Sequence, residues 1–341
     1  MKALGRNPSG QKLLALQQSR NFREGKFQNL NETVMLVEGV SYGKMMKEYY
    51  GKPKATTPPM PMPSVQTDLR KLPDGAPTFV WFGHSSYLLR IGGLNVLVDP
   101  VFSGNASPFS FFGKAFPGSD AYAVEDMPDI DILIITHDHY DHLDFPTILK
   151  LHPRIKLIIT TLGVGSHLEY WGVPAEKIRE LDWWQSIDQN AHWRITATPA
   201  RHFSGRSLVR NKTLWSSFVL ETDGRRIYLG GDSGYDDHFV NIGRHYGPFH
   251  AAILECGQYG KNWPYIHMFP EQTVQAAVDL RAAVLIPVHW GKFVLSVHEW
   301  NEPVRRAFMK AVEVGMAIAT PRIGEALRIG DPVIPNKWWD T

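Results

Sequence analysis

The sequence predicts an α/β fold in which two mixed sheets are flanked by helices. Three features of its 341 residues lead to this prediction. Short apolar runs typical of strands recur from Thr78 onward, the first of them are close enough to pair as hairpins, and later ones alternate with amphipathic helical patterns. Hairpins followed by strand–helix alternation are typical of packed sheets with helices outside them.

Ten apolar runs are predicted as strands, because they are rich in β-branched or aromatic residues and lie between turn residues. They are residues 78–82, 87–91, 94–98, 130–135, 156–161, 194–199, 214–221, 226–230, 251–255 and 284–288. Gly92 and Gly93 provide the hairpin turn between the second and third runs. Amphipathic spacing predicts helices at residues 163–170, 236–246, 271–281 and 302–314.

The composition and the predicted secondary structure of residues 1–70 differ from those of the rest of the chain. Residues 11–19 are compatible with a short helix, and five prolines crowd residues 51–64. Proline-rich stretches do not build a core, so we expect residues 1–70 to form an extended arm over a single domain of residues 71–341. A disordered tail is the alternative interpretation of the arm.

The bulk composition limits the classes of function. With 36 basic and 34 acidic residues the net charge is +2, which gives no reason to expect a nucleic acid partner. Cys256 is the only cysteine, so we expect no disulfide framework and a buried, apolar role for this thiol. Residues 1–20 lack the apolar core of a secretory signal, and no apolar run approaches the ~18 residues of a membrane span. We therefore expect a soluble, cytoplasmic protein.

The most informative stretch is Thr-His-Asp-His-Tyr-Asp-His at residues 136–142. It follows the predicted buried strand at 130–135 and precedes a predicted helix at 144–150, with Asp144 as the cap and Pro146 in the first turn. Polar residues on a turn at a strand end, held by a rigid scaffold, are often functional. The turn is therefore the first candidate for a functional site.

The side chains of this turn are of the types that bind divalent metal ions. Neutral imidazoles and carboxylates suit zinc and similar ions. His137 and His139 are two residues apart and can face one ion, whereas Asp141 and His142 can turn towards a second ion. The alternative is three surface histidines on a polar loop.

One turn cannot complete two metal shells, and three later residues are candidates for the remainder. His202, Asp232 and His289 each follow an apolar run that is predicted as a strand. If these strands end at the same edge, their ligand-type side chains converge there. Taken singly, each of the three could equally be an ordinary polar residue.

These residues resemble the pattern of the metallo-β-lactamase superfamily. Within it, the chain resembles the N-acyl-phosphatidylethanolamine-hydrolysing phospholipase D group and its bacterial relatives, over about residues 15–310. The segments that carry the resemblance are residues 83–86, 98–103, 106–108, 136–144, 181–184, 231–235, 247–249 and 289–291.

The resemblance implies a four-layer αββα sandwich whose catalytic domain spans residues 71–341, with two metal ions at one edge. The implied metal ligands are His137, His139 and His202 for the first ion, Asp141, His142 and His289 for the second, and Asp232 as the bridge. It implies two Zn²⁺ ions, with Mn²⁺ or Fe²⁺ as alternatives. Asp141 and Asp232 are then also catalytic, as is His267, since the related lipases carry a histidine in this place.

Two ions about 3.5–4 Å apart can share a hydroxide as nucleophile, so no serine or cysteine nucleophile is needed. The expected activity is phosphodiester hydrolysis of the phospholipase D type on N-acyl-phosphatidylethanolamine-like lipids, with His267 contacting the phosphoryl group or protonating the leaving group. A loop histidine with a backbone partner is the alternative for His267. We expect Asp99 to orient the metal turn and His84 to be structural rather than a ligand.

The substrate is less defined than the metal site. Phe102, Phe109, Phe111, Phe112 and Phe116 could line an acyl groove, rest on a membrane or pack in the core. A hydrolase of another small substrate, such as a lactone or sugar-phosphate lactone, a nuclease, and a metal-binding protein without turnover remain alternatives. The expected partner is a small-molecule or lipid phosphodiester, with no nucleic acid. Peripheral contact with the inner face of a membrane and a homodimer are left open.

Overall fold

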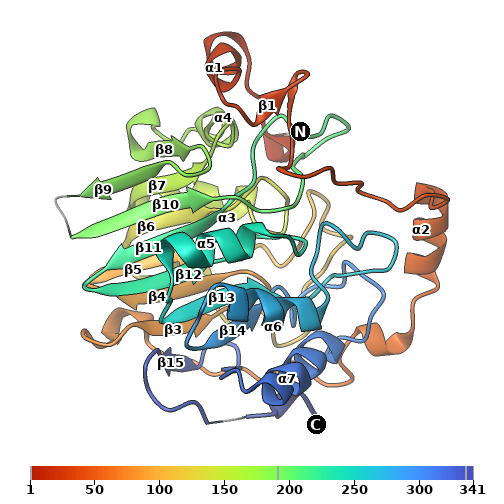
Figure 1. Cartoon of the computed structure of the whole chain (residues 1–341), viewed down its shortest axis with the longest axis vertical. Helices are drawn as coiled ribbons and strands as arrows, with labels where there is room; N and C mark the ends of the chain where they lie inside the picture. The colour runs from red at the N-terminus through yellow and green to blue at the C-terminus, as the bar shows by residue number, and fades with distance from the viewer. Residues whose placement is uncertain (1, 190–191, 335, 341) are drawn as a thin grey trace.

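The computed structural model describes residues 2–189, 192–334 and 336–340, and its centre is a pair of facing sheets (Figure 1). The seven-stranded sheet has the order β15-β3-β4-β5-β6-β7-β8. Its strands are β3 (Thr78–Trp81), β4 (Tyr87–Ile91), β5 (Leu94–Val98), β6 (Ile130–Ile135), β7 (Ile155–Thr161), β8 (Ile178–Leu181) and β15 (Ala326–Arg328).

The second sheet has six strands in the order β14-β13-β12-β11-β10-β9. They are β9 (Ser186–Gln189), β10 (Trp193–Thr198), β11 (Ser217–Thr222), β12 (Arg225–Leu229), β13 (Ala251–Glu255) and β14 (Leu285–Val288). In this sheet β12, β13 and β14 are parallel, and the other pairs are antiparallel. Both sheets are therefore mixed, as predicted.

Helices cover the outer faces of the two sheets. The helices α3 (Phe145–Leu151) and α4 (Gly165–Tyr170) share a buried apolar cluster with one face of the seven-stranded sheet. Figure 1 shows α5 (His238–Tyr246), α6 (Pro270–Asp279) and α7 (Glu302–Val314) in front of the six-stranded sheet, with which they share the largest apolar cluster. The predicted αββα sandwich is confirmed.

The strand β6 shows why a central strand of this fold is apolar at nearly every position; the half-buried Asp131 is its one polar residue. Ile132 and Ile134 face the core between the sheets, whereas Leu133 and Ile135 face the cluster under α3 and α4. Successive side chains of a strand point to opposite faces, so a strand between two packed layers needs apolar residues at nearly every position.

The strand directions bring the important strand ends to one rim. The strands β3, β5 and β6 run in the same direction in one sheet, because β3 and β5 are both antiparallel to β4 and β6 is parallel to β5. The same reasoning aligns β10, β12, β13 and β14 in the other sheet. The segments that follow these strands carry the candidate ligands, so the topology places them on one side of the sandwich.

The N-terminal arm is more structured than the sequence predicts. It contains α1 (Gly10–Leu16), the short strands β1 (Phe22–Arg23) and β2 (Lys26–Phe27), and α2 (Tyr42–Tyr50), which stands at the right of Figure 1. Trp171 Nε1 donates to Lys2 O at 2.8 Å, so the arm is fastened to the body near its start. The division at residue 70 remains a prediction.

Some local predictions differ from the structure. The edge strands β8, β9 and β15 were not predicted, because polar residues interrupt their apolar pattern. Asp144 is the N-cap residue of α3, as predicted, but its side chain makes no capping hydrogen bond: its Oδ2 accepts from Ser103 N at 3.0 Å and Thr147 Oγ1 at 2.5 Å.

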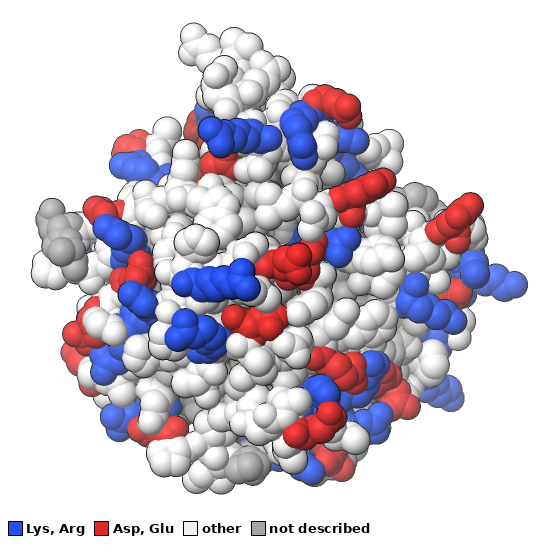
Figure 2. All heavy atoms as spheres, in the orientation of Figure 1, with Lys and Arg blue, Asp and Glu red and all other residues white. Residues whose placement is uncertain are grey.

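Acidic and basic side chains are interspersed on the face of the molecule that Figure 2 shows. None of the described helices combines the length and apolarity needed to cross a bilayer.

Candidate metal centre

The turn after β6 forms the first group of converging ligand-type side chains. The distance from His137 Nε2 to His139 Nδ1 is 2.9 Å, and the distance from His202 Nε2 to the same His139 atom is 3.2 Å. With one carboxylate oxygen of Asp232, the four ligand atoms all lie within 4.8 Å of one another. This spacing fits the coordination of a single metal ion by three imidazoles and a carboxylate.

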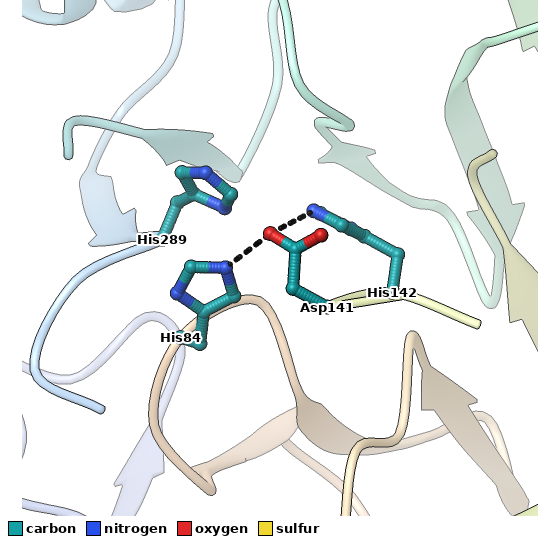
Figure 3. A group of neighbouring side chains, drawn as sticks. All are labelled: His84, Asp141, His142 and His289. Carbon is teal, nitrogen blue, oxygen red and sulfur yellow. Dashed lines mark hydrogen bonds and ion pairs between the residues drawn. The ribbon is translucent and has the colours of Figure 1, made fainter. Parts of the chain in front are cut away.

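A second group lies beside the first and contains His84, Asp141, His142 and His289, which point towards one another in Figure 3. Asp141 Oδ2 lies 2.8 Å from His84 Nε2 and 3.6 Å from His142 Nε2. His84 was predicted to be structural, yet it lies inside this group, and its ring centre is 4.0 Å from that of His289. Its contact with Asp141 is compatible with support of a ligand as well as with ligation.

Asp232 lies between the two groups. Its Oδ2 is 3.2 Å from His142 Nε2, 3.7 Å from His202 Nε2 and 3.8 Å from His137 Nε2. Its Oδ1 is 3.2 Å from His289 Nδ1. One carboxylate thus faces nitrogen atoms of both groups, which is the arrangement that a bridging ligand needs.

Hydrogen bonds among these side chains do not satisfy all of their buried nitrogen and oxygen atoms. His142 Nε2, Asp232 Oδ1 and His84 Nδ1 are buried without a hydrogen-bond partner among the described residues. Unsatisfied polar atoms are costly inside a protein and need an explanation. Divalent ions between the imidazoles and carboxylates would satisfy His142 Nε2 and Asp232 Oδ1, so the residues present fit a metal centre. His84 Nδ1 lies on the side of its ring away from Asp141 in Figure 3 and is not explained in this way.

Hydrogen bonds behind the turn fix the orientation of its rings. His142 Nδ1 donates to Asp99 Oδ2 at 2.7 Å, and Thr136 Oγ1 donates to the same oxygen at 2.6 Å. His137 Nδ1 lies 3.0 Å from Thr136 Oγ1, which can accept its proton. Because each Nδ1 atom has a hydrogen-bond partner on the side away from the site, the Nε2 atoms of both rings face the site. Asp99 thus orients the metal turn, as predicted.

Burial and charge set the protonation of these side chains. Burial and the neighbouring imidazoles lower the pKa of His137 well below its usual range. Burial likewise lowers the pKa of His202 and His289, despite the opposing Asp232 carboxylate. Burial alone would raise the pKa of Asp232, but His142 and His289 hold it well below its usual range. His142 is the exception: burial opposes its protonation, but Asp232, Asp141 and Asp99 raise its pKa well above the usual range, so a metal ion there would have to displace a proton. Neutral His137, His202 and His289 beside an ionised Asp232 are the ligand forms that a metal ion requires.

The backbone around the site has tight approaches and strained residues. A Cβ at Gly231 would lie 2.6 Å from Ser216 O, so this glycine allows a close approach to the neighbouring strand. His84, Asp99 and His289 adopt left-handed backbone conformations, with φ values of +52°, +42° and +67°. Such conformations in non-glycine residues cost free energy and tend to cluster at functional sites.

His267 lies next to the two groups, before α6, as the sequence predicts. Its Nδ1 donates to Glu255 Oε2 at 2.7 Å. Burial opposes protonation of His267, but the Glu255 carboxylate outweighs this effect and raises the pKa of His267 to about 9. Burial raises the pKa of Glu255 to about 7. The partner of His267 is thus a buried carboxylate rather than the backbone.

A pocket of about 230 Å³ opens onto the ligand-type side chains. Its wall includes Met35, Leu36 and Met45 from the N-terminal arm, although the arm is remote in sequence from the other lining residues. Arg210 also lines it, with its guanidinium carbon 5.0 Å from the centre of the Phe203 ring. The pocket therefore combines an apolar wall, a cationic side chain and the candidate metal centre.

The phenylalanines after Asp99 fall into two sets. Phe116 is buried and Phe102 is partly buried against the apolar cluster under α3 and α4, which is the predicted alternative of core packing. Phe109 and Phe111 are 44% and 78% exposed and stack with ring centres 5.5 Å apart, and Phe112 packs on Tyr49 of α2 at 5.6 Å. The exposed set forms an apolar surface that includes part of the arm. Cys256 is free and buried, as predicted.

The sandwich fold with ligand-type side chains gathered at one rim is that of the metallo-β-lactamase-fold, metal-dependent hydrolases. The chain belongs to the beta-lactamase superfamily, because a model of the beta-lactamase superfamily domain matches residues 94–290.

Two similar proteins and one solved structure are informative. An uncharacterized protein of Mycobacterium tuberculosis is 38% identical over 328 residues, which cover 95% of this chain and 88% of that protein. N-acyl-phosphatidylethanolamine-hydrolyzing phospholipase D 1 of Caenorhabditis elegans is 32% identical over 233 residues, which cover 64% of this chain and 65% of that protein. Igni18, a metallo hydrolase of Ignicoccus hospitalis, superimposes with a TM-score of 0.58 at 20% identity, over 74% of this chain and 98% of that chain, which shows the shared fold.

Proposed function

We propose that this chain is a phosphodiesterase of the phospholipase D type that acts on N-acyl-phosphatidylethanolamine-like lipids. The observation that carries the proposal is the position of Asp232 between two groups of ligand-type side chains, which supports a binuclear centre. The phospholipase D relative supports the substrate class. The proposed ligands are His137, His139 and His202 for one ion, Asp141, His142 and His289 for the other, and Asp232 for both.

The ions of this site are proposed to be zinc, since imidazole and carboxylate ligands suit it. When bound, a pair of divalent ions lowers the pKa of water and polarises a phosphoryl oxygen. The side chains supply the remaining functions. Asp141, which is held by His84, can orient the proton of the attacking water. His267 lines the same pocket and can protonate the departing alcohol oxygen.

The pocket supports a substrate with an anionic centre next to an apolar group. Of the described residues that line it, Arg210 alone carries a permanent positive charge, and a guanidinium suits a phosphate oxygen. Met35, Leu36, Met45 and Leu295 present apolar surface at the same pocket. An acyl chain can lie along this wall while the phosphate lies beside the metal ligands.

The exposed phenylalanines support contact with a membrane surface. Phe109, Phe111 and Phe112 are at least 36% exposed, and Tyr50 of α2 is 71% exposed. Exposed apolar patches of this kind mark sites of interaction. The adjoining helix α2 also carries Met45 of the pocket wall, so a lipid could pass from the membrane to the metal centre along the arm. We propose that this contact is with the inner face of a membrane.

A second candidate is a hydrolase of a small substrate such as a lactone. The pocket volume of about 230 Å³ favours it, because pockets for drug-sized ligands usually measure ≈ 300–1,000 Å³. A diacyl lipid would have to leave most of its chains outside such a pocket. A lactone or sugar-phosphate lactone would fit within it.

The test is metal analysis of the purified protein together with a substrate panel. The panel contains N-acylated phosphatidylethanolamine in vesicles, a chromogenic bis-nitrophenyl phosphate and a series of lactones. The proposal expects two metal ions per chain and the highest kcat/KM on the N-acylated lipid. A preference for a lactone would support the second candidate, and two bound ions without turnover would support a metal-binding protein.

A further inference from the structure

The carboxylate of Glu255 lies next to the metal centre, although the sequence did not mark it as a site residue. Glu255 ends β13 at the functional rim and is 1% exposed, and its Oε2 accepts from His267 Nδ1 at 2.7 Å. We propose that Glu255 is a positioning residue that keeps a proton on His267 Nδ1 and thereby presents Nε2 to the substrate. The inference rests on the proposed function and assigns to it a residue outside the proposed ligands.

Hydrogen bonds fix the position of the Glu255 carboxylate, so it can act as a hydrogen-bond acceptor at a defined place. Its Oε1 accepts from Ser233 N at 2.8 Å and from Met268 N at 3.3 Å, and its main-chain oxygen accepts from Thr273 Oγ1 at 2.8 Å. Each carboxylate oxygen therefore has its own assigned partner. The two backbone N–H groups occupy one oxygen, which leaves the other for His267.

The ring of His267 is held as well. It stacks on His289 with ring centres 5.3 Å apart and an interplanar angle of 19°, and it meets His202 edge-on at 4.9 Å. Since Nδ1 is engaged by Glu255, Nε2 is the nitrogen that the ring can offer to the pocket it lines. The pair thus resembles other active sites in which a carboxylate selects the tautomer of a catalytic imidazole.

A third metal site is the rival interpretation, because ligand atoms of Asp232, Glu255, His267 and His289 lie within 4.8 Å of one another. The hydrogen bonds of Glu255 argue against it. Its Oε2 accepts from His267 Nδ1, and its Oε1 accepts from Ser233 N and Met268 N, so both carboxylate oxygens already have hydrogen-bond partners within the chain.

The chemistry of the proposed step is balanced within this pair. As the bond from phosphorus to the leaving oxygen breaks, the electron pair goes to that oxygen, which takes a proton from His267 Nε2. The ring keeps its other proton on Nδ1, which continues to donate a hydrogen bond to Glu255. Without an acceptor at Nδ1, the ring could not hold that proton and also donate from Nε2.

The substitution Glu255→Gln changes this arrangement at constant shape. The amide must turn its oxygen to Ser233 N and Met268 N, because both are donors. Its NH2 group then faces His267 Nδ1, which has to accept, so the proton of the ring moves to Nε2. The substitution therefore removes the proton from Nδ1 without removing a side chain from the core.

The experiment compares Glu255→Gln, His267→Gln and the double variant with the wild type, and Glu180→Gln is the matched control. Glu180 also accepts a backbone N–H, from Gly165 at 2.8 Å, but does not line the pocket. We expect Glu255→Gln to lower kcat by about 10²-fold on the N-acylated lipid, whose alkoxide leaving group needs a proton. The nitrophenyl ester, whose leaving group needs none, should lose less than about threefold.

Two further measurements distinguish positioning from a general structural effect. In the His267→Gln background, Glu255→Gln should have no additional effect on kcat. The ¹⁵N signals of imidazole should show a proton on His267 Nδ1 in the wild type and none there in Glu255→Gln. Metal content and the unfolding midpoint should match those of Glu180→Gln.

Several results would overturn the inference. The first is an equal loss of kcat on the lipid and on the nitrophenyl ester, and the second is additive effects of Glu255→Gln and His267→Gln on kcat. The others are loss of a metal ion from Glu255→Gln and the absence of a proton on His267 Nδ1 in the wild type. The last measurement needs no variant, so a failure of Glu255→Gln to fold leaves the inference open to refutation. A wild type inactive on both diesters would refute the proposed function, whereas the position of the Nδ1 proton would still decide the role of Glu255.

Discussion

Asp99 Oδ2 accepts a hydrogen bond from His142 Nδ1 at 2.7 Å, and this contact connects the two halves of the seven-stranded sheet at the metal centre. Asp99 follows β5 and His142 follows β6, and the two strands are parallel neighbours. Asp99 also accepts from Thr136 N at 2.9 Å through Oδ1. The aspartate thus holds both the start of the metal turn and one of its rings.

We expect Asp99→Asn to weaken metal binding. An amide can satisfy His142 Nδ1 or Thr136 with its oxygen but turns a donor to the remaining partner, so the His142 ring loses its fixed orientation. Loss of such outer support typically costs 10–100-fold in metal affinity. Zinc competition with a chelating dye measures the change. An affinity equal to that of the wild type would contradict the supporting role.

Asp232→Asn should remove both bound metal and turnover. The substitution takes away the negative charge that faces His142, His202 and His289, and it replaces one ligand oxygen by a donor. Elemental analysis and the rate on bis-nitrophenyl phosphate test this. Asp223→Asn, an exposed turn residue, is the control that should keep metal and activity. Two ions and full activity in Asp232→Asn would rule out the bridging role.

Removal of metal should lower the unfolding temperature as well as the activity. Each ion that binds only the folded chain stabilises it by about 4 kcal/mol at a free concentration 1,000 times Kd, so two ions contribute about 8 kcal/mol, which is roughly 11 °C for a chain of this length. Calorimetry before and after chelation measures the shift. Zinc should restore both properties, whereas magnesium, which prefers oxygen ligands, should not. An unchanged unfolding temperature in metal-free protein would refute metal binding at this buried site.

Replacement of Phe111 and Phe112 by serine should weaken vesicle binding by about 10- to 100-fold, because two partly inserted rings contribute on the order of 1 kcal/mol each. Turnover of the lipid in vesicles should fall, whereas turnover of the soluble nitrophenyl ester should not. Vesicle sedimentation measures the binding. Val312→Ser, which is 66% exposed on α7, is the control. Unchanged lipid hydrolysis in the double variant would exclude the membrane contact.

The stability of the fold should fall on mild acidification because of His238. Burial lowers the pKa of His238 from 6.5 to about 3, against the opposing effect of Asp236. The folded state therefore favours the neutral ring: the contribution of His238 is complete above pH 6.5 and is lost as the pH falls towards 3. The loss is about 1.4 kcal/mol per pH unit, or about 2 kcal/mol between pH 7 and pH 5.

Guanidinium unfolding of the wild type and His238→Gln at pH 7 and pH 5 tests this dependence. The variant should lose less stability than the wild type on acidification, since both share any loss of metal. His245→Gln, which is exposed on the same helix, should behave as the wild type. An equal pH dependence of His238→Gln and the wild type would contradict the prediction.

The sequence predicts the centre of this fold better than its edges. The predicted strands at 87–91, 94–98, 130–135 and 251–255 have the observed bounds, because burial on both faces requires continuous apolar runs. The edge strand β9 is exposed or half-buried throughout, so its residues carry no such pattern. Helix α7 was predicted with its observed bounds from its amphipathic spacing.

The candidate site was predictable wherever a ligand-type residue follows a strand. The structure brings together His137, His139, Asp141, His142, His202, Asp232 and His289, and places His267 beside them. His84 also follows a predicted strand, but its place in a glycine–serine turn led to the prediction of a structural role, whereas its Nε2 lies 2.8 Å from Asp141 Oδ2. Glu255 ends a predicted strand, and the reasoning applied to Asp232 and His289 could have identified it.

The contacts of the N-terminal arm also bear on the order of folding. Arg206 Nη2 donates to Ala3 O at 2.8 Å, and Arg206 Nη1 donates to Asp138 O at 2.7 Å within the metal turn. The arm is synthesised before the arginine that anchors it, at a separation of 203 positions. Because contacts between residues that are distant in sequence form slowly, we expect the arm to pack against the body only after most of the sandwich has left the ribosome.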